Sequence, residues 1–149
     1  MTVSDEASGN ILEVAELRTY FFTRAGIVKA VDGMSFSLKP RETLAIVGES
    51  GCGKSMTALS IMRLVPEPPG RIVGGSVTLD GRDLLKLDAD AMREGRGHEI
   101  TMIFQEPLPS LNPVRSIGHQ TGQAIRLQQG PTASRAPQRT ERRVRRGNQ

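Results

Sequence analysis

The sequence predicts an α/β fold built around a phosphate-binding loop. One observation is the apolar run ETLAIV at 42–47, which has the continuous apolar character of a strand covered on both faces. A second is the glycine-rich stretch GESGCGKS at 48–55, which follows this run directly. A third is the segment 54–65, whose large apolar residues recur at helical spacing. A strand, a glycine loop and a helix in this order are typical of a nucleotide-binding domain.

Two strand-like segments precede the loop. Residues 11–22 alternate between apolar and polar side chains, as a half-buried strand does. Residues 30–40 repeat that alternation up to Pro40, which ends it. We therefore expect two strands of the antiparallel type before the loop.

Breaks after the expected helix define the next elements. PEPPG at 66–70 ends the helix, because proline cannot continue it. SVTLDGRDLL at 76–85 predicts a strand and a tight turn, because Asp-Gly suits a hairpin turn with positive φ. DADAMREG at 88–95 predicts a short helix, with Asp88 placed to cap its start.

The last periodic segments are a strand and a helix on either side of a proline-rich loop. EITMIF at 99–104 predicts a strand, and it runs directly into the loop QEPLPSLNP at 105–113. SIGHQTGQAIRL at 116–127 predicts a helix, although its two glycines weaken the pattern. No internal repeat is present.

The bulk composition is that of one soluble domain. The 149 residues have room for a single domain, and 37% hydrophobic content is sufficient for a core. No apolar run approaches the ~20 residues that a membrane-spanning helix needs. Residues 1–10 are polar and acidic, unlike a secretory signal, and we expect a disordered leader there. The single cysteine cannot form an internal disulfide, which fits a reducing cytoplasmic compartment.

The basic charge is confined to the C-terminal end of the chain. Residues 130–149 hold six arginines and one acid, Glu141, out of 20 basic and 16 acidic residues in total. Residues 1–129 therefore hold 14 basic and 15 acidic residues, a net charge of −1. Apolar periodicity disappears at the same point, so we expect 129–149 to be a disordered tail. Since aromatic stacking platforms are also scarce, nucleic acid is not an expected partner.

The glycine-rich stretch matches the pattern G-x-x-x-x-G-K-[ST]. Its glycines let the backbone turn tightly and bring successive N–H groups around one anion. The helix that follows directs its positive end at the same place. The alternative is a chance glycine-rich turn, but the flanking strand and helix favour phosphate binding.

We expect this loop to bind Mg-ATP. Lys54 would place its charge between the β- and γ-phosphates, and Ser55 would offer its hydroxyl to Mg²⁺. The residues expected to contact the nucleotide form one run: Gly48, Glu49, Ser50, Gly51, Cys52, Gly53, Lys54, Ser55 and Met56. We interpret Cys52 as a small filler residue rather than a reactive thiol. The two histidines, His98 and His119, lie too far apart in sequence to predict a metal site.

The order of these segments resembles the ATP-binding subunits of ABC transporters. The stretches AVDGMSFSL, IVGESGCGKS, ALSIMRL and MIFQEPLPSLNP are similar to the oligopeptide/dipeptide (and nickel) uptake branch in particular, and the similarity covers about 11–128. The resemblance implies a P-loop NTPase fold of the ABC type, with an N-terminal antiparallel β-subdomain and, here, an incomplete parallel sheet. It also implies ATPase activity in an importer of peptides or similar small solutes.

The resemblance implies further roles for the loop at 105–113. Gln105 would be the Q-loop glutamine, which reaches Mg²⁺ and the attacking water, and 106–113 would touch the membrane subunits. Without the resemblance, Gln105 is an ordinary glutamine at a strand end. The implied partners are transmembrane permease subunits, a second ATP-binding subunit and, indirectly, a substrate-binding protein. The chain would then lie on the inner face of the cell membrane.

The family also stacks an aromatic ring on the adenine, upstream of the glycine loop. TYFFT supplies three candidates, Tyr20, Phe21 and Phe22. Phe21 matches the family pattern best, although alternation along a strand requires at least one of these rings to be core.

The family's groups for hydrolysis do not occur in these residues. Asp80 precedes a glycine in an expected turn, and Glu106 follows a glutamine rather than an aspartate, so neither fits the metal-binding Asp and its adjacent Glu. The signature loop Leu-Ser-Gly-Gly-Gln is also absent. Our hypothesis is a reading-frame shift or gene truncation near residue 128, since out-of-frame, GC-rich sequence would produce an arginine-rich tail. We do not expect turnover by this chain alone.

Two other interpretations stay open. The chain could be a non-hydrolysing nucleotide-binding protein or an inert remnant without a transport role. A weaker alternative treats the arginine-rich tail as a basic arm for nucleic acid or anionic lipid.

Overall fold

The computed structural model describes residues 9–105 and 112–129. The chain divides into two compact units, 1–94 and 95–149. The predictions for the leader, for most of the segment after Gln105 and for the arginine-rich tail fall largely or wholly outside the described residues. No described helix is both long and apolar enough to cross a bilayer.

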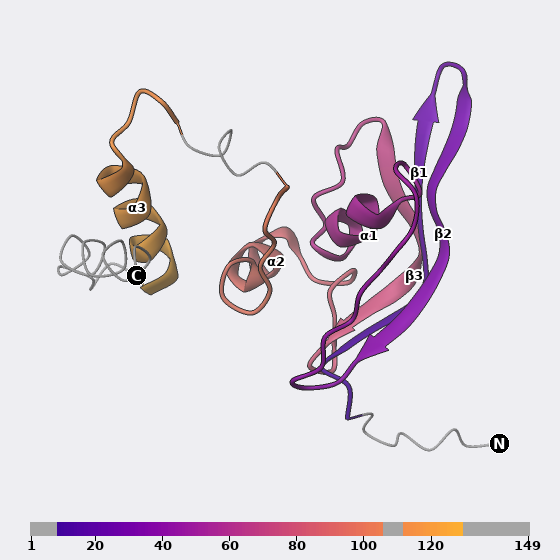
Figure 1. Cartoon of the computed structure of the whole chain (residues 1–149), viewed down its shortest axis with the longest axis horizontal. Coiled ribbons are helices and arrows are strands. Elements are labelled where there is room, and N and C mark those ends of the chain that lie inside the picture. Colours follow the sequence, from indigo (N-terminus) through magenta and orange to yellow (C-terminus); the bar gives the residue numbers. More distant parts are fainter. Residues whose placement is uncertain (1–8, 106–111, 130–149) are drawn as a thin grey trace. The chain divides into compact units, whose positions relative to one another are not determined.

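The first unit is organised around an antiparallel sheet (Figure 1). Its spatial order is β2-β1-β3-β4, and every neighbouring pair is antiparallel. The strands are β1 (Leu12–Thr23), β2 (Gly26–Leu38), β3 (Gly70–Leu79) and β4 (Arg82–Asp83). The predicted antiparallel subdomain is therefore present, and β2 is longer at its start than the alternation indicated.

The turn between β3 and β4 has the conformation that its sequence predicted. Asp80 has φ +46° and Gly81 has φ +77°, so both central residues lie in the left-handed region. Leu79 pairs with Arg82 across this turn. Two successive positive φ values match the right-handed twist of a hairpin, which is why Asp-Gly is favoured there.

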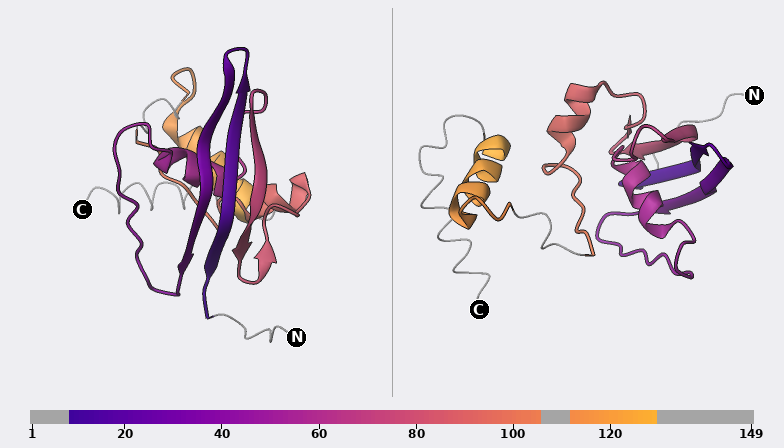
Figure 2. Two further views of the ribbon diagram at one scale, coloured as in Figure 1. Left: turned by 90° about the vertical axis from the view of Figure 1, so that its right-hand side faces the viewer. Right: turned by 90° about the horizontal axis from the view of Figure 1, so that it is seen from above.

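The helix α1 (Lys54–Ile61) packs on one face of the sheet (Figure 2). The core of this unit consists of strand residues pointing to that face and of apolar side chains from the segments around them. Its buried hydrophobic members are Val14, Leu17, Val31, Ile61, Met62, Val77, Leu79, Leu84 and Met92. Two hydroxyls also lie in it, since Thr19 Oγ1 and Ser60 Oγ are 2.7 Å apart and both residues are fully buried.

The end of α1 is set by the backbone rather than by the proline segment. Arg63 has φ +51°, and its N–H donates to Ser60 O (3.0 Å) while the N–H of Leu64 donates to Leu59 O (2.8 Å). These two bonds form a Schellman motif, which usually has glycine at the left-handed position. The helix therefore ends four residues before the predicted boundary at 65.

Two further helices agree with the sequence. In α2 (Ala89–Gly95), Asp88 Oδ1 accepts a hydrogen bond from the N–H of Ala91 at 2.7 Å, as expected of an N-cap. The second unit contains α3 (Ile117–Gln129), where Ser116 Oγ accepts from the N–H of His119 at 3.3 Å.

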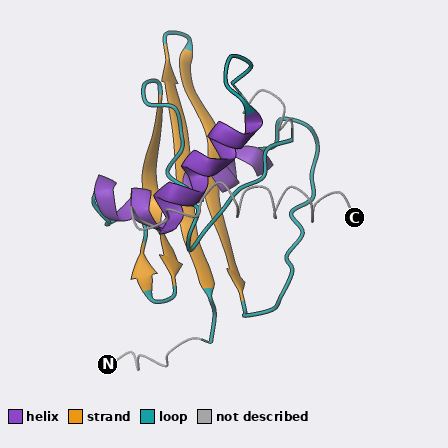
Figure 3. Cartoon of the chain, turned by 90° about the vertical axis from the view of Figure 1, so that its left-hand side faces the viewer, coloured by secondary structure: helices purple, strands orange, loops and turns teal. Residues whose placement is uncertain are grey.

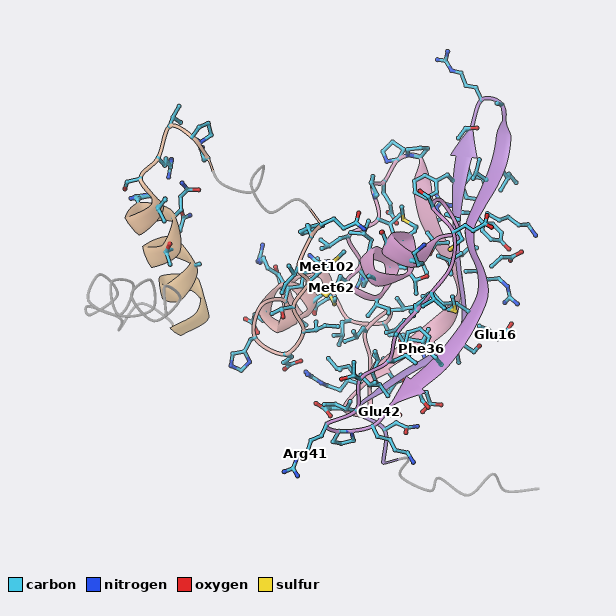
Figure 4. All side chains as sticks on the ribbon, in the orientation of Figure 1. Glu16, Phe36, Arg41, Glu42, Met62 and Met102 are labelled. Atoms are coloured by element: carbon cyan, nitrogen blue, oxygen red, sulfur yellow. The ribbon has the colours of Figure 1, made fainter. Side chains whose placement is uncertain are left out.

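The strands predicted at 42–47 and 99–104 are not formed. Residues 42–47 and most of 99–104 belong to no helix or strand (Figure 3). All of 42–47 is exposed, and so is most of 99–104. Val47 is 87% exposed and Ile103 is 91% exposed. An apolar run indicates burial, but a strand also needs a hydrogen-bonded neighbour, and the described residues pair neither segment into a sheet. Beyond β2 the chain instead turns, and Glu42 Oε2 accepts from the N–H of Lys39 at 2.8 Å (Figure 4).

Candidate functional site

The glycine loop leads from the exposed segment 42–47 into α1 and closes on itself. Gly51 and Gly53 have φ of +83° and +92°, a conformation that side chains with a Cβ rarely adopt. A Cβ at Gly48 would lie 2.6 Å from Cys52 Sγ, so a side chain at this position would require the Cys52 side chain to move. The loop also has an internal bond from the N–H of Cys52 to Glu49 O (3.3 Å).

The side chain of Lys54 folds back onto the loop. Its Nζ donates to Gly48 O at 2.7 Å and to Glu49 O at 2.6 Å, and it lies 3.5 Å from Cys52 Sγ. The ammonium group is therefore held by the loop's carbonyl oxygens, and the residue is half-buried.

The start of α1 has no side chain that satisfies its first amides. Its N-cap is Gly53, which has no side-chain cap, and the first turn has no acidic residue. The first N–H groups of a helix have no partner within the helix. Gly53 O instead accepts from the N–H of Thr57 (2.8 Å) and from its Oγ1 (3.0 Å), which holds the first turn together. The amides of Lys54, Ser55 and Met56 are thus available to an anion.

The hydroxyl of Ser55 suits the expected metal ligand. Ser55 is exposed on the first turn of α1, next to Lys54. Within the described part of the chain its hydroxyl makes no hydrogen bond. A hydroxyl with free lone pairs beside the expected phosphate site fits a hard cation such as Mg²⁺, which prefers oxygen ligands.

The three aromatic candidates occupy different environments. Tyr20 Oη donates to Asp32 Oδ1 at 2.5 Å, and Lys29 Nζ lies 5.4 Å above the centre of the Tyr20 ring. Phe21 is half-buried, and its Cε1 would lie 3.0 Å from a Cβ at Gly70. Phe22 is 47% exposed. The assignment of the adenine platform to Phe21 stays a prediction, and one edge of that ring is already in contact with protein.

Charges around Tyr20 shift three pKa values. The hydrogen bond to Asp32 raises the pKa of Tyr20 above its ordinary value, since it favours the neutral phenol. Accepting bonds from Tyr20 and from Lys29 Nζ (3.1 Å) lowers the pKa of Asp32. The bond to Asp32 likewise raises the pKa of Lys29. Lys29 and Asp32 are exposed on the surface of the β1–β2 hairpin, and Tyr20 is half-buried beside them.

The structure describes Gln105 in the second unit, where it is exposed. Its approach to the glycine loop stays a prediction. Glu106 lies outside the described residues, and Asp80 lies in the β3–β4 turn.

One contact of the loop could not be found by reading the motif. A Cβ on Gly53 would lie 2.2 Å from Ala30 O in β2. The side chain of Ala30 is a methyl group without polar atoms, and only the folded structure reveals that its carbonyl group lies next to Gly53. Likewise, the buried contact of Thr19 with Ser60 left no signal in the sequence.

Comparisons with known proteins place this geometry in a family. The sequence profile described as ABC transporter matches residues 31–147. A Sinorhizobium fredii protein named as a peptide ABC transporter ATP-binding protein is 48% identical over 117 residues, covering 78% of this chain and 35% of that protein. A Brucella abortus protein named as a peptide import ATP-binding protein is 48% identical over 130 residues, covering 87% of this chain and 39% of that protein. The chain thus spans less than half the length of these curated relatives.

A solved structure supports the same fold. It is the dimeric, post-hydrolysis state of the ATP-binding cassette MJ0796 bound to ADP and Pi. The TM-score is 0.69 at 19% identity, and the match covers 88% of this chain and 54% of that one. The predicted ABC-type fold is confirmed. With its profile match, its relatives and its fold in agreement, the chain belongs to the ABC transporter family.

Proposed function

We propose that this chain forms the ATP-binding part of a subunit of an ABC importer for peptides or similar small solutes. The observation that carries the proposal is the uncapped start of α1, with Lys54 Nζ already turned into the loop at 48–55. The names of the relatives, which refer to peptide import and ATP binding, support the substrate class.

Different groups of the chain would bind different parts of Mg-ATP. Backbone N–H groups of the loop and of the first turn of α1 would donate to the β-phosphate. Lys54 would exchange its carbonyl partners for oxygens of the β- and γ-phosphates, and so bring a full positive charge to the part of the ligand with the most negative charge. Mg²⁺, when bound with the nucleotide, would neutralise phosphate charge, with Ser55 Oγ and the Gln105 amide as the protein ligands. Phe21 would stack on the adenine.

The coupling role is proposed for the segment that starts at Gln105. Sensing of nucleotide by Gln105 and contact of 106–113 with permease subunits would link ATP binding to transport, on the cytoplasmic face of the membrane. A second ATP-binding subunit would complete the nucleotide site. Because these 149 residues contain no Leu-Ser-Gly-Gly-Gln stretch, we propose that this chain alone binds ATP without hydrolysing it.

The test is a calorimetric titration of the chain with Mg-ATP. The wild type should bind, and Lys54→Ala should abolish binding, because it removes the charge inside the loop. Lys39→Ala is the matched control, since Lys39 is an exposed lysine outside the loop and should bind like the wild type. Phosphate release should stay at background for all three proteins.

The outcomes separate the parts of the proposal. A wild type that does not bind Mg-ATP would refute the nucleotide-binding role. Phosphate release that depends on Lys54 would refute only the statement that the chain does not hydrolyse ATP.

A further inference from the structure

The edge strand β2 has an extra residue at Ala30. In the pairing of β1 with β2, Thr19 faces Val31 and the next residue, Tyr20, faces Lys29. One step along β1 therefore corresponds to two steps along β2, which makes Ala30 a β-bulge. Val31 is buried on the α1 side, whereas Lys29 lies over the Tyr20 ring on the exposed hairpin surface. Val31 and Lys29 thus lie on opposite faces of the sheet, as two adjacent residues of a regular strand would, and Ala30 is the extra residue between them.

The carbonyl group of this bulge lies against the glycine loop. A Cβ at Gly53 would lie 2.2 Å from Ala30 O and 3.4 Å from Ala30 C. Gly53 is also the N-cap of α1 and the acceptor for Thr57. The backbone that begins the phosphate-binding amides is therefore in close contact with the backbone of β2.

This contact fixes one end of α1, and a second contact fixes the other. Near its last turn, Ser60 is held to Thr19 through the buried hydroxyl pair. At its first turn, the contact is that of Gly53 with Ala30. The segment 42–47, which precedes the loop, is exposed along its length and gives little support. The direction of the first N–H groups of α1 then depends on the position of the Ala30 bulge in β2.

We propose that the bulge at Ala30 is a positioning element for the phosphate-binding loop. The carbonyl oxygen of Ala30 contacts the backbone of Gly53 and so fixes the position of the first turn of α1. In this position the first amides of α1 point at the site of the β-phosphate. This inference rests on the proposed binding of ATP at 48–55. It concerns a backbone group, so the presence of a residue at position 30 matters and its side chain does not.

A competing explanation is that the bulge only protects the edge of the sheet. Bulges on edge strands disturb the unpaired N–H and C=O row and prevent other chains from pairing with it. The same strand offers an internal comparison, because Leu17 faces Met34 and Arg18 faces Asp32, which makes Gly33 a second extra residue. A Cβ at Gly33 would approach only the side chains of Glu16 and Arg18. Edge protection predicts the same role for both bulges, whereas our proposal separates them.

The test compares deletion of Ala30 with deletion of Gly33 in the 149-residue chain. Deletion of Ala30 converts its bulge into regular pairing and leaves every other side chain on its own face of the sheet. Deletion of Gly33 does the same at the step from Leu17 to Arg18, while the extra residue of β1 between Val14 and Leu17 stays in place. Deletion of Ala30 should weaken Mg-ATP binding by about tenfold or more, since small displacements of a preorganised site are costly. Deletion of Gly33 and the substitution Ala30→Ser should both bind within about twofold of the wild type, because both keep the supporting carbonyl.

Equal binding by the wild type and the Ala30 deletion would overturn the inference, and so would equal losses in both deletions. If the wild type itself does not bind, the proposed function fails first. Should the Ala30 deletion fail to fold, the wild type supplies the second measurement. On titration with Mg-ATP, the carbonyl ¹³C resonance of Ala30 should shift and that of Gly33 should not. An unmoved Ala30 resonance in a protein that binds ATP would refute the proposal.

Discussion

The buried hydroxyl pair between Thr19 and Ser60 allows a sharp test of how α1 is held on the sheet. Ser60 has one hydroxyl proton, and it donates this proton to Met56 O at 2.6 Å. Thr19 must then be the donor in the 2.7 Å contact with Ser60 Oγ. Both residues are fully buried. The two single substitutions should therefore have different costs.

The expected magnitudes follow from what each substitution leaves unpaired. Ser60→Ala removes the acceptor and leaves the Thr19 hydroxyl buried without a partner, which costs about 1–3 kcal/mol in the free energy of unfolding. The better helix propensity of alanine reduces this loss in the free energy of unfolding by up to about 0.5 kcal/mol. Thr19→Val leaves the Ser60 proton on Met56 O and removes only a donor, so it should cost about 1 kcal/mol or less.

The double variant completes the cycle. With both hydroxyls replaced by apolar groups of similar shape, no buried polar group is left without a partner, and most of the loss caused by Ser60→Ala should be recovered. The assay is urea unfolding followed by circular dichroism, with the midpoint and slope compared across the four proteins. The reasoning is refuted if Thr19→Val costs as much as Ser60→Ala, or if the two losses simply add in the double variant.

Three further predictions concern the hairpin and the segment before the loop. Because Tyr20 is the only tyrosine and no tryptophan is present, absorbance at alkaline pH titrates Tyr20 alone; its midpoint should lie above 10.0 and should fall in Asp32→Asn. Phe21→Ala should weaken binding of ATP and of AMP alike if this ring stacks on adenine, with Phe22→Ala as the matched control; an effect in Phe22→Ala alone would move the assignment. Since Val47 is 87% exposed in an unpaired apolar run, Val47→Lys should reduce self-association in sedimentation experiments, and unchanged association would exclude this run as its cause.

The signs of the pH effects in the hairpin follow from these pKa shifts. The raised pKa of Tyr20 contributes stability that is present below 10.0 and is lost as the pH rises through the folded-state value. The lowered pKa of Asp32 contributes stability that is present above 3.8 and is lost as the pH falls through its folded-state value. Asp32 is exposed and Tyr20 is only half-buried, so solvent screening keeps either contribution small.

The elements that the sequence predicted well are those whose causes are local. Alternation along 11–22 describes a strand with one covered face, and the turn at Asp80 and Gly81 needs only its own backbone conformation. The strand at 42–47 failed because its apolar character reports a need for burial and contains no information on the neighbour that would supply it. The end of α1 was misplaced because Arg63 adopts a left-handed conformation that glycine would have signalled.

The candidate site also has one part that local sequence predicts and one part that it does not. The motif at 48–55 could be predicted because its residue types, at their fixed spacing, each have a chemical role: the glycines allow close turns, Lys54 supplies charge and Ser55 supplies a hydroxyl. Ala30 is invisible to such reasoning, because its contribution to Gly53 is a carbonyl group that every residue has. If the bulge positions the loop, position 30 should accept many side chains but not the loss of a residue. A site supported in this way tolerates substitution and is sensitive to the length of the strand, which is a property that no motif of residue types can express.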